Sequence, residues 1–225
     1  MLDDGPPEGT VVYTPEQRAG RGQRKNAWHS APGLNLTFSV LYHPQFLAPD
    51  HSFALNRVAS LAVRAVVAQV LPGHKVEVKW PNDVLVNDKK IAGILIETTL
   101  ERSQLRTAII GIGLNVNQTD FPDNLVRPAT SLALERNQET EIRPLMEQIW
   151  RELEGRYLAL RSGRTEKLDR EYLEFLYGYQ EWLPMEGKGE SKMGMVMGVD
   201  PQGRLALQFR PQLQYFDLQE IKFVP

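Results

Sequence analysis

The sequence contains no cysteine, which excludes a disulfide framework, thiol catalysis and a thiolate metal site. It has no excess of one charge either, because 26 Lys and Arg stand against 28 Asp and Glu, so no general attraction to nucleic acid or membrane surfaces is expected. The four histidines lack the spacing of metal ligands, and no apolar run approaches the length of a membrane span. A cytoplasmic protein is expected, with one domain of ordinary size and a small appendage.

The most informative segment reads Lys-Trp-Pro-Asn-Asp at residues 79–83 and is followed by Lys-Ile-Ala-Gly at 90–93. Alternation of polar and apolar residues predicts a strand over 75–80, which ends at Pro81 because proline lacks the amide hydrogen of a ladder. A two-residue turn at Asn87-Asp88 would place Asp83 opposite Ala92, with Lys90 on the same sheet face as Asp83. That spacing suits a metal–phosphate unit, whereas a three-residue loop would separate the two side chains. The alternative is an ordinary hairpin with a surface Asp and a surface Lys.

A second segment, residues 17–28, contains Gly20-Arg21-Gly22 and three cations: Arg21, Arg24 and Lys25. A Gly-X-Gly loop lets backbone N–H groups approach an anion closely, and arginine can form paired contacts with carboxylate or phosphate. The segment lacks the further glycines of a P-loop or a dinucleotide fingerprint. A solvated basic turn and a nucleic-acid patch remain the alternatives.

The third segment, residues 105–117, is predicted to be a strand with two unlike faces. One face is apolar and contains Ala108, Ile110, Ile112, Leu114 and Val116. The other contains Gly111 and Gly113 and ends in Asn115 and Asn117. Two glycines in a strand indicate either a flat surface for a ligand or a β-bulge.

In order and spacing, these segments resemble the catalytic domain of biotin–protein ligases (biotin–[acetyl-CoA-carboxylase] ligases). The matching elements are Gln17 with Gly20-Arg21-Gly22 and Trp28, the blocks 79–83 and 90–97, and Gly-Ile-Gly-Leu-Asn-Val-Asn at 111–117; weaker matches are 128–132 and 198–200. The resemblance implies an α+β fold: a mixed central β-sheet flanked by helices, of the biotin/lipoate ligase catalytic, class II synthetase-like type. It also implies a catalytic domain at 1–178 and a small SH3-like β-barrel at 179–225.

The resemblance also implies a reaction. Biotin and ATP, with Mg²⁺, would form biotinyl-5′-AMP, and the biotinyl group would pass to a lysine of a biotin carboxyl carrier protein domain of acetyl-CoA carboxylase. Two alternatives stay open: a lipoate or octanoate ligase or transferase, and an inactive biotin-binding relic. No nucleic-acid or membrane partner is expected, and the protein would be a monomer or a homodimer.

Particular residues acquire roles from the same resemblance. The implied catalytic residues are Lys90, Asp83 and Arg21. The implied biotin site is Gln17, Gly20, Arg21, Gly22, Trp28, Lys90, Gly93, Gly111 and Gly113. The implied nucleotide contacts are Arg21, Gly22, Gln23, Arg24, Asn82, Lys90, Asn115 and Ser131. The implied magnesium ligands are Asp83 and Asn115.

The sequence departs from the family pattern at three places. The family commonly has Arg at the position of Gln23 and Gly at that of Lys25, so Arg24 is expected to take over part of the phosphate contact. A Ser/Thr-Asn pair that precedes the glycine loop in the family is absent here. We therefore expect a short form without that segment and without an N-terminal DNA-binding domain.

The remaining pattern is structural. Apolar residues at helical spacing predict helices at about 52–71, from Pro144 to about 160, and at about 165–177. Short strands separated by turn residues predict the barrel after residue 180. Trp80 is expected in the core.

Overall fold

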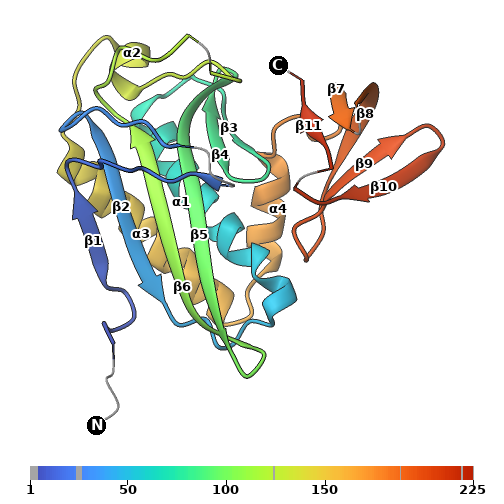
Figure 1. Cartoon of the computed structure of the whole chain (residues 1–225), viewed down its shortest axis with the longest axis horizontal. Coiled ribbons are helices and arrows are strands. Elements are labelled where there is room, and N and C mark those ends of the chain that lie inside the picture. The colour runs from blue at the N-terminus through green and yellow to red at the C-terminus, as the bar shows by residue number, and fades with distance from the viewer. Residues whose placement is uncertain (1–4, 24–26, 124, 188, 219, 225) are drawn as a thin grey trace.

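The structure is a computed structural model that describes residues 5–23, 27–123, 125–187, 189–218 and 220–224. Its larger sheet has six strands in the described residues, with the spatial order β1-β2-β6-β5-β4-β3 (Figure 1). Their bounds are β1 Val11–Thr14, β2 Asn35–Tyr42, β3 Val76–Lys79, β4 Asp83–Val86, β5 Lys89–Glu101 and β6 Gln104–Asn115. Every neighbouring pair is antiparallel, so the expected mixed sheet is wrong in this detail, although the α+β class is confirmed.

Helices cover one face of this sheet and leave the other face open to the cavity described below. The helices are α1 Phe53–Val70, α2 Leu132–Arg136, α3 Ile142–Arg161 and α4 Glu166–Glu174, with a short 3-10 turn at Pro49–His51. Helix α1 packs against α3 and against β3, β4 and β5. The helix Pro49–Val70 is long and apolar enough to span a membrane, but more than half of it is buried, as expected for a core helix.

A smaller antiparallel sheet follows α4 and fits the expected SH3-like barrel (Figure 1). Its order is β10-β9-β8-β7-β11, with bounds β7 Trp182–Gly187, β8 Glu190–Val199, β9 Leu205–Phe209, β10 Gln212–Phe216 and β11 Lys222–Phe223. The sheet begins shortly after residue 178, the boundary that the sequence suggested. That boundary itself stays a prediction.

The turn between β4 and β5 has the two predicted residues. Asn87 and Asp88 both adopt positive φ, 46° and 66°, as the favoured two-residue hairpin turn requires. The predicted pairing of Asp83 with Ala92 is wrong, because a register shift beside Val84 and Leu85 pairs Asp83 with Gly93 instead. The shift is a bulge that adds one residue to β5, and it leaves Lys90 on the face of Asp83.

Strand β6 has the two predicted faces. Ala108, Ile110, Ile112, Leu114 and Val116 are all buried in the core. The register is continuous through Gly111 and Gly113 on both sides of the strand, so the alternative of a bulge at these glycines is wrong. The two glycines therefore form a flat strip without side chains on the open face of the sheet.

Candidate functional site

A cavity of about 500 Å³ lies over this glycine strip and is enclosed by the larger sheet, the loop after β1 and the small barrel. Its size is in the range of ordinary small-molecule sites. Of the predicted site residues, the following border it: Gln17, Arg21, Gly22, Gln23, Trp28, Asn82, Asp83, Lys90, Gly93, Gly111 and Gly113.

The cation and the carboxylate of the hairpin meet at one end of the cavity. Lys90 Nζ lies 2.6 Å from Asp83 Oδ1, and both side chains are mostly buried. The backbone around Lys90 is also fixed, because its N–H donates to the Pro128 carbonyl (2.8 Å) and its carbonyl accepts from the Thr130 N–H (2.9 Å). An ammonium held in this way is a preorganised site for a carboxylate or phosphate.

A second lysine lies on the far side of Asp83. Lys79 is paired with Asp83 across the β3–β4 hairpin and borders the same cavity. Burial lowers the pKa of Lys79, the charge of Asp83 opposes this shift, and the nearby cations Arg127 and Lys90 add to it. The cluster therefore holds more positive than negative charge, which favours an anionic ligand.

Asn82 fastens the turn that carries Asp83. Its side-chain Nδ2 donates to the Ile94 carbonyl at 2.7 Å, while the Ile94 N–H donates to the Asn82 carbonyl at 2.9 Å. These two bonds tie the turn to β5 and fix the position of Asp83. The amide nitrogen of Asn82 is thus occupied, and its expected nucleotide contact stays a prediction.

The indole ring of Trp28 lies on the glycine strip. A Cβ atom at Gly113 would lie 2.5 Å from Trp28 Cε2, and one at Gly93 would lie 3.3 Å from Cζ3. Lys90 Nζ is 5.7 Å from the centre of the ring. Trp28 Nε1 is buried and has no hydrogen-bond partner among the described residues. The strip next to Gly111 is free of the ring, since a Cβ there would meet Leu95 O and Ser39 Oγ.

The glycine loop folds back on itself at Gly20. The Trp28 N–H donates to the Gly20 carbonyl (3.0 Å), and Arg21 forms a bridge with Ala27. A Cβ at Gly20 would collide with the Trp28 carbonyl, so only glycine fits there. Arg24, for which a phosphate contact was predicted, and the loop cation Lys25 lie outside the described residues.

Arg21 is engaged at the opposite end of the cavity from Lys90. Its guanidinium forms a double contact with Glu97, with Nη1–Oε1 and Nη2–Oε2 distances of 3.0 and 2.7 Å. Glu97 is four residues beyond Gly93 on β5, or about 13 Å at the usual strand rise. The expected cooperation of Arg21 with Lys90 is therefore not formed here, because a closer carboxylate holds the arginine.

Comparisons with known proteins identify the family of this chain. Residues 2–115 match the model of the biotin/lipoate A/B protein ligase family. A biotin–[acetyl-CoA-carboxylase] ligase of Mycobacterium tuberculosis is 30% identical over 89% of this chain and 73% of its own length. This chain belongs to the biotin/lipoate A/B protein ligase family.

Two further comparisons bear on the ligase fold and on length. The bifunctional ligase/repressor BirA of Bacillus subtilis is 31% identical over 92% of this chain, which spans 64% of the length of that relative. The biotin protein ligase of Aquifex aeolicus, solved in complex with biotin and ATP, superposes with a TM-score of 0.79 at 22% identity, covering 98% of this chain and 91% of the other. At that identity the superposition supports the ligase fold alone.

Three residues that the ligase resemblance suggested lie outside the cavity formed by the described residues: Gly20, Asn115 and Ser131. Asn115 is buried and donates through Nδ2 to the Thr130 carbonyl at 2.9 Å. Ser131 Oγ accepts from the Leu134 N–H and caps α2. Each has a structural partner, and their ligand contacts stay predictions.

The sequence analysis missed other residues that border the cavity. Glu97 ends the 90–97 segment and shares a strand face with Gly93, a parity that could have identified it. Leu218, Ile221 and Lys222 come from the barrel. No local pattern marks those three, because only the docking of the barrel brings them there.

Proposed function

We propose that this protein is an ATP-dependent ligase that activates biotin as biotinyl-5′-AMP and transfers it to a lysine of the carrier domain of acetyl-CoA carboxylase. The observation that carries the proposal is the Lys90–Asp83 pair at the end of a glycine strip inside one cavity. The names of the relatives, biotin–[acetyl-CoA-carboxylase] ligase among them, support the substrate and the acceptor.

The strip supplies a place for a neutral bicyclic ring. The surface beside Gly111 is bare, with Ser39 next to it, and Gln17 borders the same cavity; both side chains offer donors and acceptors for a ureido group. Trp28 then forms the wall for the apolar arm. This orientation directs the carboxylate of biotin toward Lys90.

The first step joins two anions. A carboxylate oxygen of biotin bonds to the α-phosphorus of ATP, the bond from that phosphorus to the bridging oxygen breaks, and pyrophosphate leaves. Bringing unit charges to about 4 Å costs roughly 4 kcal/mol at an effective dielectric near 20. Lys90 offsets this repulsion, and Arg21 adds to the effect once it has left Glu97.

Magnesium enters this proposal with the ATP phosphates. The described residues contain no cluster of three His, Asp or Glu side chains that could hold the ion alone, and Asn115 lies outside the cavity. Asp83 is the carboxylate closest to where the nucleotide would bind. A magnesium ion bound chiefly by phosphate oxygens and water is typical of nucleotide enzymes.

The second step needs an uncharged lysine. At pH 7 only about one free lysine in 2,500 is deprotonated, given a pKa near 10.4. The cations Lys79 and Lys90 disfavour an incoming ammonium and so lower its pKa. The amine attacks the acyl carbon, an amide forms, AMP leaves, and Asp83 is placed to orient the amine or accept its proton.

The test is incubation with ATP, Mg²⁺ and a carrier domain, together with labelled biotin, lipoate or octanoate. We expect biotin-dependent exchange of pyrophosphate into ATP, and label on the carrier with biotin alone. Label from lipoate or octanoate would support transfer of those acyl groups instead. Biotin binding without exchange would identify a relic.

A further inference from the structure

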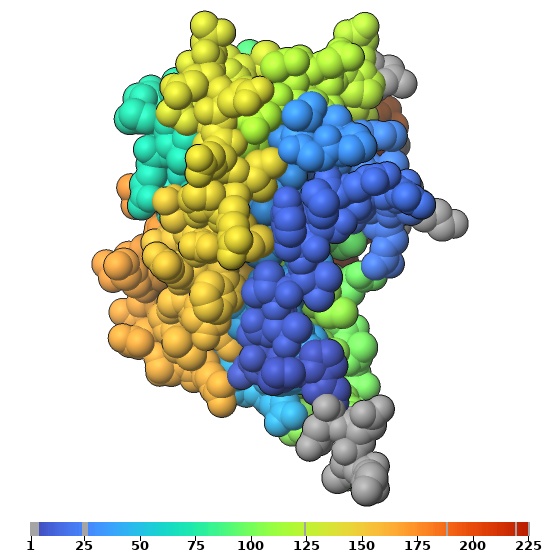
Figure 2. Space-filling view, turned by 90° about the vertical axis from the view of Figure 1, so that its left-hand side faces the viewer, coloured from blue at the N-terminus to red at the C-terminus, as the bar shows by residue number. Residues whose placement is uncertain are grey.

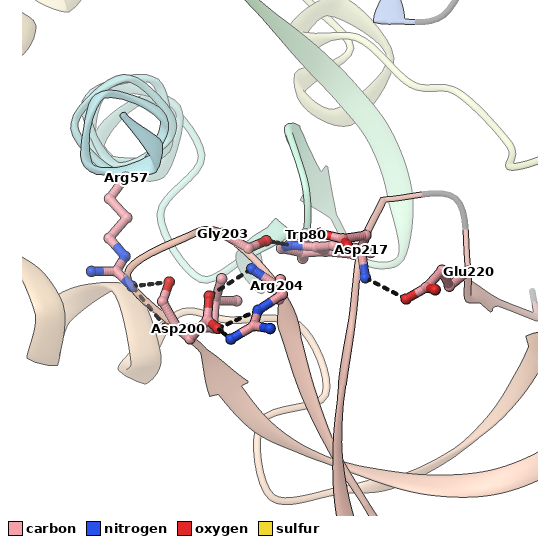
Figure 3. A network of polar contacts seen from close by, with 8 residues as sticks. Arg57, Trp80, Asp200, Gly203, Arg204, Asp217 and Glu220 are labelled. Atoms are coloured by element: carbon pink, nitrogen blue, oxygen red, sulfur yellow. Dashed lines mark hydrogen bonds and ion pairs between the residues drawn. The ribbon is translucent and has the colours of Figure 1, made fainter. Parts of the chain in front are cut away.

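One contact between the barrel and the active-site hairpin is made by an indole. Trp80 follows β3 directly and is nearly fully buried, with 2% of its surface exposed. Its Nε1–H donates to the Gly203 carbonyl of the barrel at 2.9 Å (Figure 3). Residues two and three positions further along the chain are Asn82 and Asp83, so the contact with the barrel lies next to the catalytic turn.

A second contact fixes the same barrel turn to α1. Arg57 Nη2 donates to the carbonyls of Val199 and Asp200, at 2.8 and 3.2 Å, and Arg57 Nη1 lies 2.6 Å from Asp169 Oδ1 on α4. Within the turn, the Asp200 carboxylate accepts from the backbone N–H and the Nε–H of Arg204, at 2.8 and 2.7 Å (Figure 3). Because Arg57 donates to these two carbonyls, the barrel turn has a defined position against α1.

The turn also approaches the larger domain too closely for a side chain. Gly203 has φ +88°, and a Cβ atom there would lie 2.7 Å from the ring of Phe53. Glycine is needed at position 203 because the φ angle is positive and because Phe53 leaves no room for a side chain. The junction is therefore built for close contact.

Docking of the barrel completes the wall of the cavity. Leu218, Ile221 and Lys222 border the same space as Asn82 and Asp83. The turn that carries them is closed by a bond from the Asp217 N–H to Glu220 Oε2 at 3.0 Å (Figure 3). This wall borders the cavity in which the reactive acyl phosphate would form.

We infer that Trp80 is a positioning residue that holds the barrel wall against the cavity and so keeps water from the activated intermediate. The inference rests on the proposed function. When the wall loosens, a water oxygen attacks the acyl carbon of the mixed anhydride in place of the carrier amine. Biotin and AMP are then released and no carrier is modified.

The test compares the full chain with its Trp80→Phe variant, which keeps an aromatic ring and removes the N–H. The measurement is AMP released per carrier lysine biotinylated, a ratio that does not depend on the fraction of active protein. We expect a ratio near one for the parent and a rise of threefold or more for Trp80→Phe, with the biotin Kd changed less than twofold. The Trp150→Phe variant, on the outer surface of α3, is the matched control and should keep the parent ratio.

A second variant covers the case in which Trp80→Phe does not fold. Arg57→Lys keeps the positive charge beside Asp169 and loses the forked contact with the two carbonyls, so it should raise the ratio in the same direction. Unchanged ratios in the folded variants, beside an active parent, would overturn this inference alone. A parent that makes no AMP from biotin and ATP would overturn the proposed function.

Discussion

Lys90 and Asp83 meet because the two-residue turn places Lys90 opposite Leu85, on the face of Asp83, and the bulge in β5 leaves this arrangement intact. Their ion pair borders the cavity and is mostly buried, and a buried charge without a partner is costly. An incoming carboxylate or phosphate would replace part of the interaction that Asp83 now makes with Lys90. The pair thus has two uses: it stabilises the ligand-free hairpin, and it presents an ammonium to the ligand.

Lys90→Ala should lower the rate of biotin-dependent pyrophosphate exchange by at least a hundredfold, because it removes the cation closest to the joined anions. Lys89→Ala is the matched control. Lys89 is the adjacent residue, and its amine lies 3.7 Å from Glu135. Equal exchange rates for the two variants would contradict the role of Lys90.

Glu97 competes with the ligand for Arg21. The double contact is exposed, with the Arg21 side chain 70% accessible, so it is worth at most about 1 kcal/mol. Glu97→Gln should therefore strengthen ATP binding by up to about fivefold, measured by calorimetry, because Arg21 becomes free to reach phosphate.

The control for this change lies on the same strand. Glu101→Gln removes a similar exposed pair, with Arg106 at 3.2 Å, at the far end of β5. It should leave the affinity for ATP unaltered. Weaker ATP binding by Glu97→Gln would show that the pair positions Arg21 for the ligand and does not restrain it.

At the scale of the element, β6 combines a structural face and a binding face in one strand. Its apolar residues are committed to the core, so the register of the strand is strongly specified. The opposite face borders the cavity and contributes nothing to the core, so it can lack side chains at Gly111 and Gly113. This division explains how two glycines can persist in a central strand at a cost in strand stability.

Gly113→Ala should reduce biotin affinity at least tenfold in a fluorescence or calorimetric titration, because the new methyl group must displace the Trp28 ring from the strip. Gly111→Ala is the matched substitution on the same face. Its methyl group would meet Leu95 O at 3.3 Å and no part of Trp28, so the intrinsic fluorescence of Trp28 should shift in the first variant and stay constant in the second. A fluorescence shift in Gly111→Ala and none in Gly113→Ala would argue against the role of Trp28 as a wall.

Local pattern was enough to predict several elements of this fold. The turn at Asn87-Asp88, the apolar face of β6 and the helix α1 each depend on neighbours in sequence, and the structure confirms them. The extra residue of β5 was missed because Ile91 and Ala92 are adjacent and both apolar, and the following segment is also mostly apolar, so the sequence does not show where the alternation shifts. The Arg21–Glu97 pair was missed because 76 positions separate its members.

At the scale of the whole molecule, the site depends on segments that meet only after folding. The resemblance pointed to a barrel near the active site, but no pattern indicated that Gly203 would accept a bond from Trp80 or that Lys222 would border the cavity. The same holds for the N-terminal segment, which lies beside α3 in Figure 2. Such contacts follow from tertiary docking, which no local pattern encodes.

Glu8 fixes that N-terminal segment to the helical layer. Its carboxylate accepts from the Tyr157 hydroxyl (2.7 Å) and the His43 N–H (2.9 Å) and lies 3.1 Å from Arg161. Burial alone would raise the pKa of Glu8, but these hydrogen bonds and the arginine charge outweigh it and lower the pKa below 4.5. The folded protein thus binds this proton less readily than the unfolded chain, so the stabilisation is present at neutral pH and is lost as pH falls below about 4.5.

Glu8→Gln should therefore lower the free energy of unfolding at pH 7 by about 1–2 kcal/mol, or a few degrees in Tm, through loss of charge-assisted hydrogen bonds. As the pH falls from 7 toward 3, the parent carboxyl takes up its proton and the difference in unfolding temperature between the two proteins should shrink. Glu16→Gln is the control, because the salt bridge of Glu16 among the described residues is with the exposed Arg18, and it should match the parent at both pH values. A deficit of equal size at pH 3 and pH 7 would show that the side chain acts through packing, and the electrostatic anchoring of this segment to α3 would then be wrong.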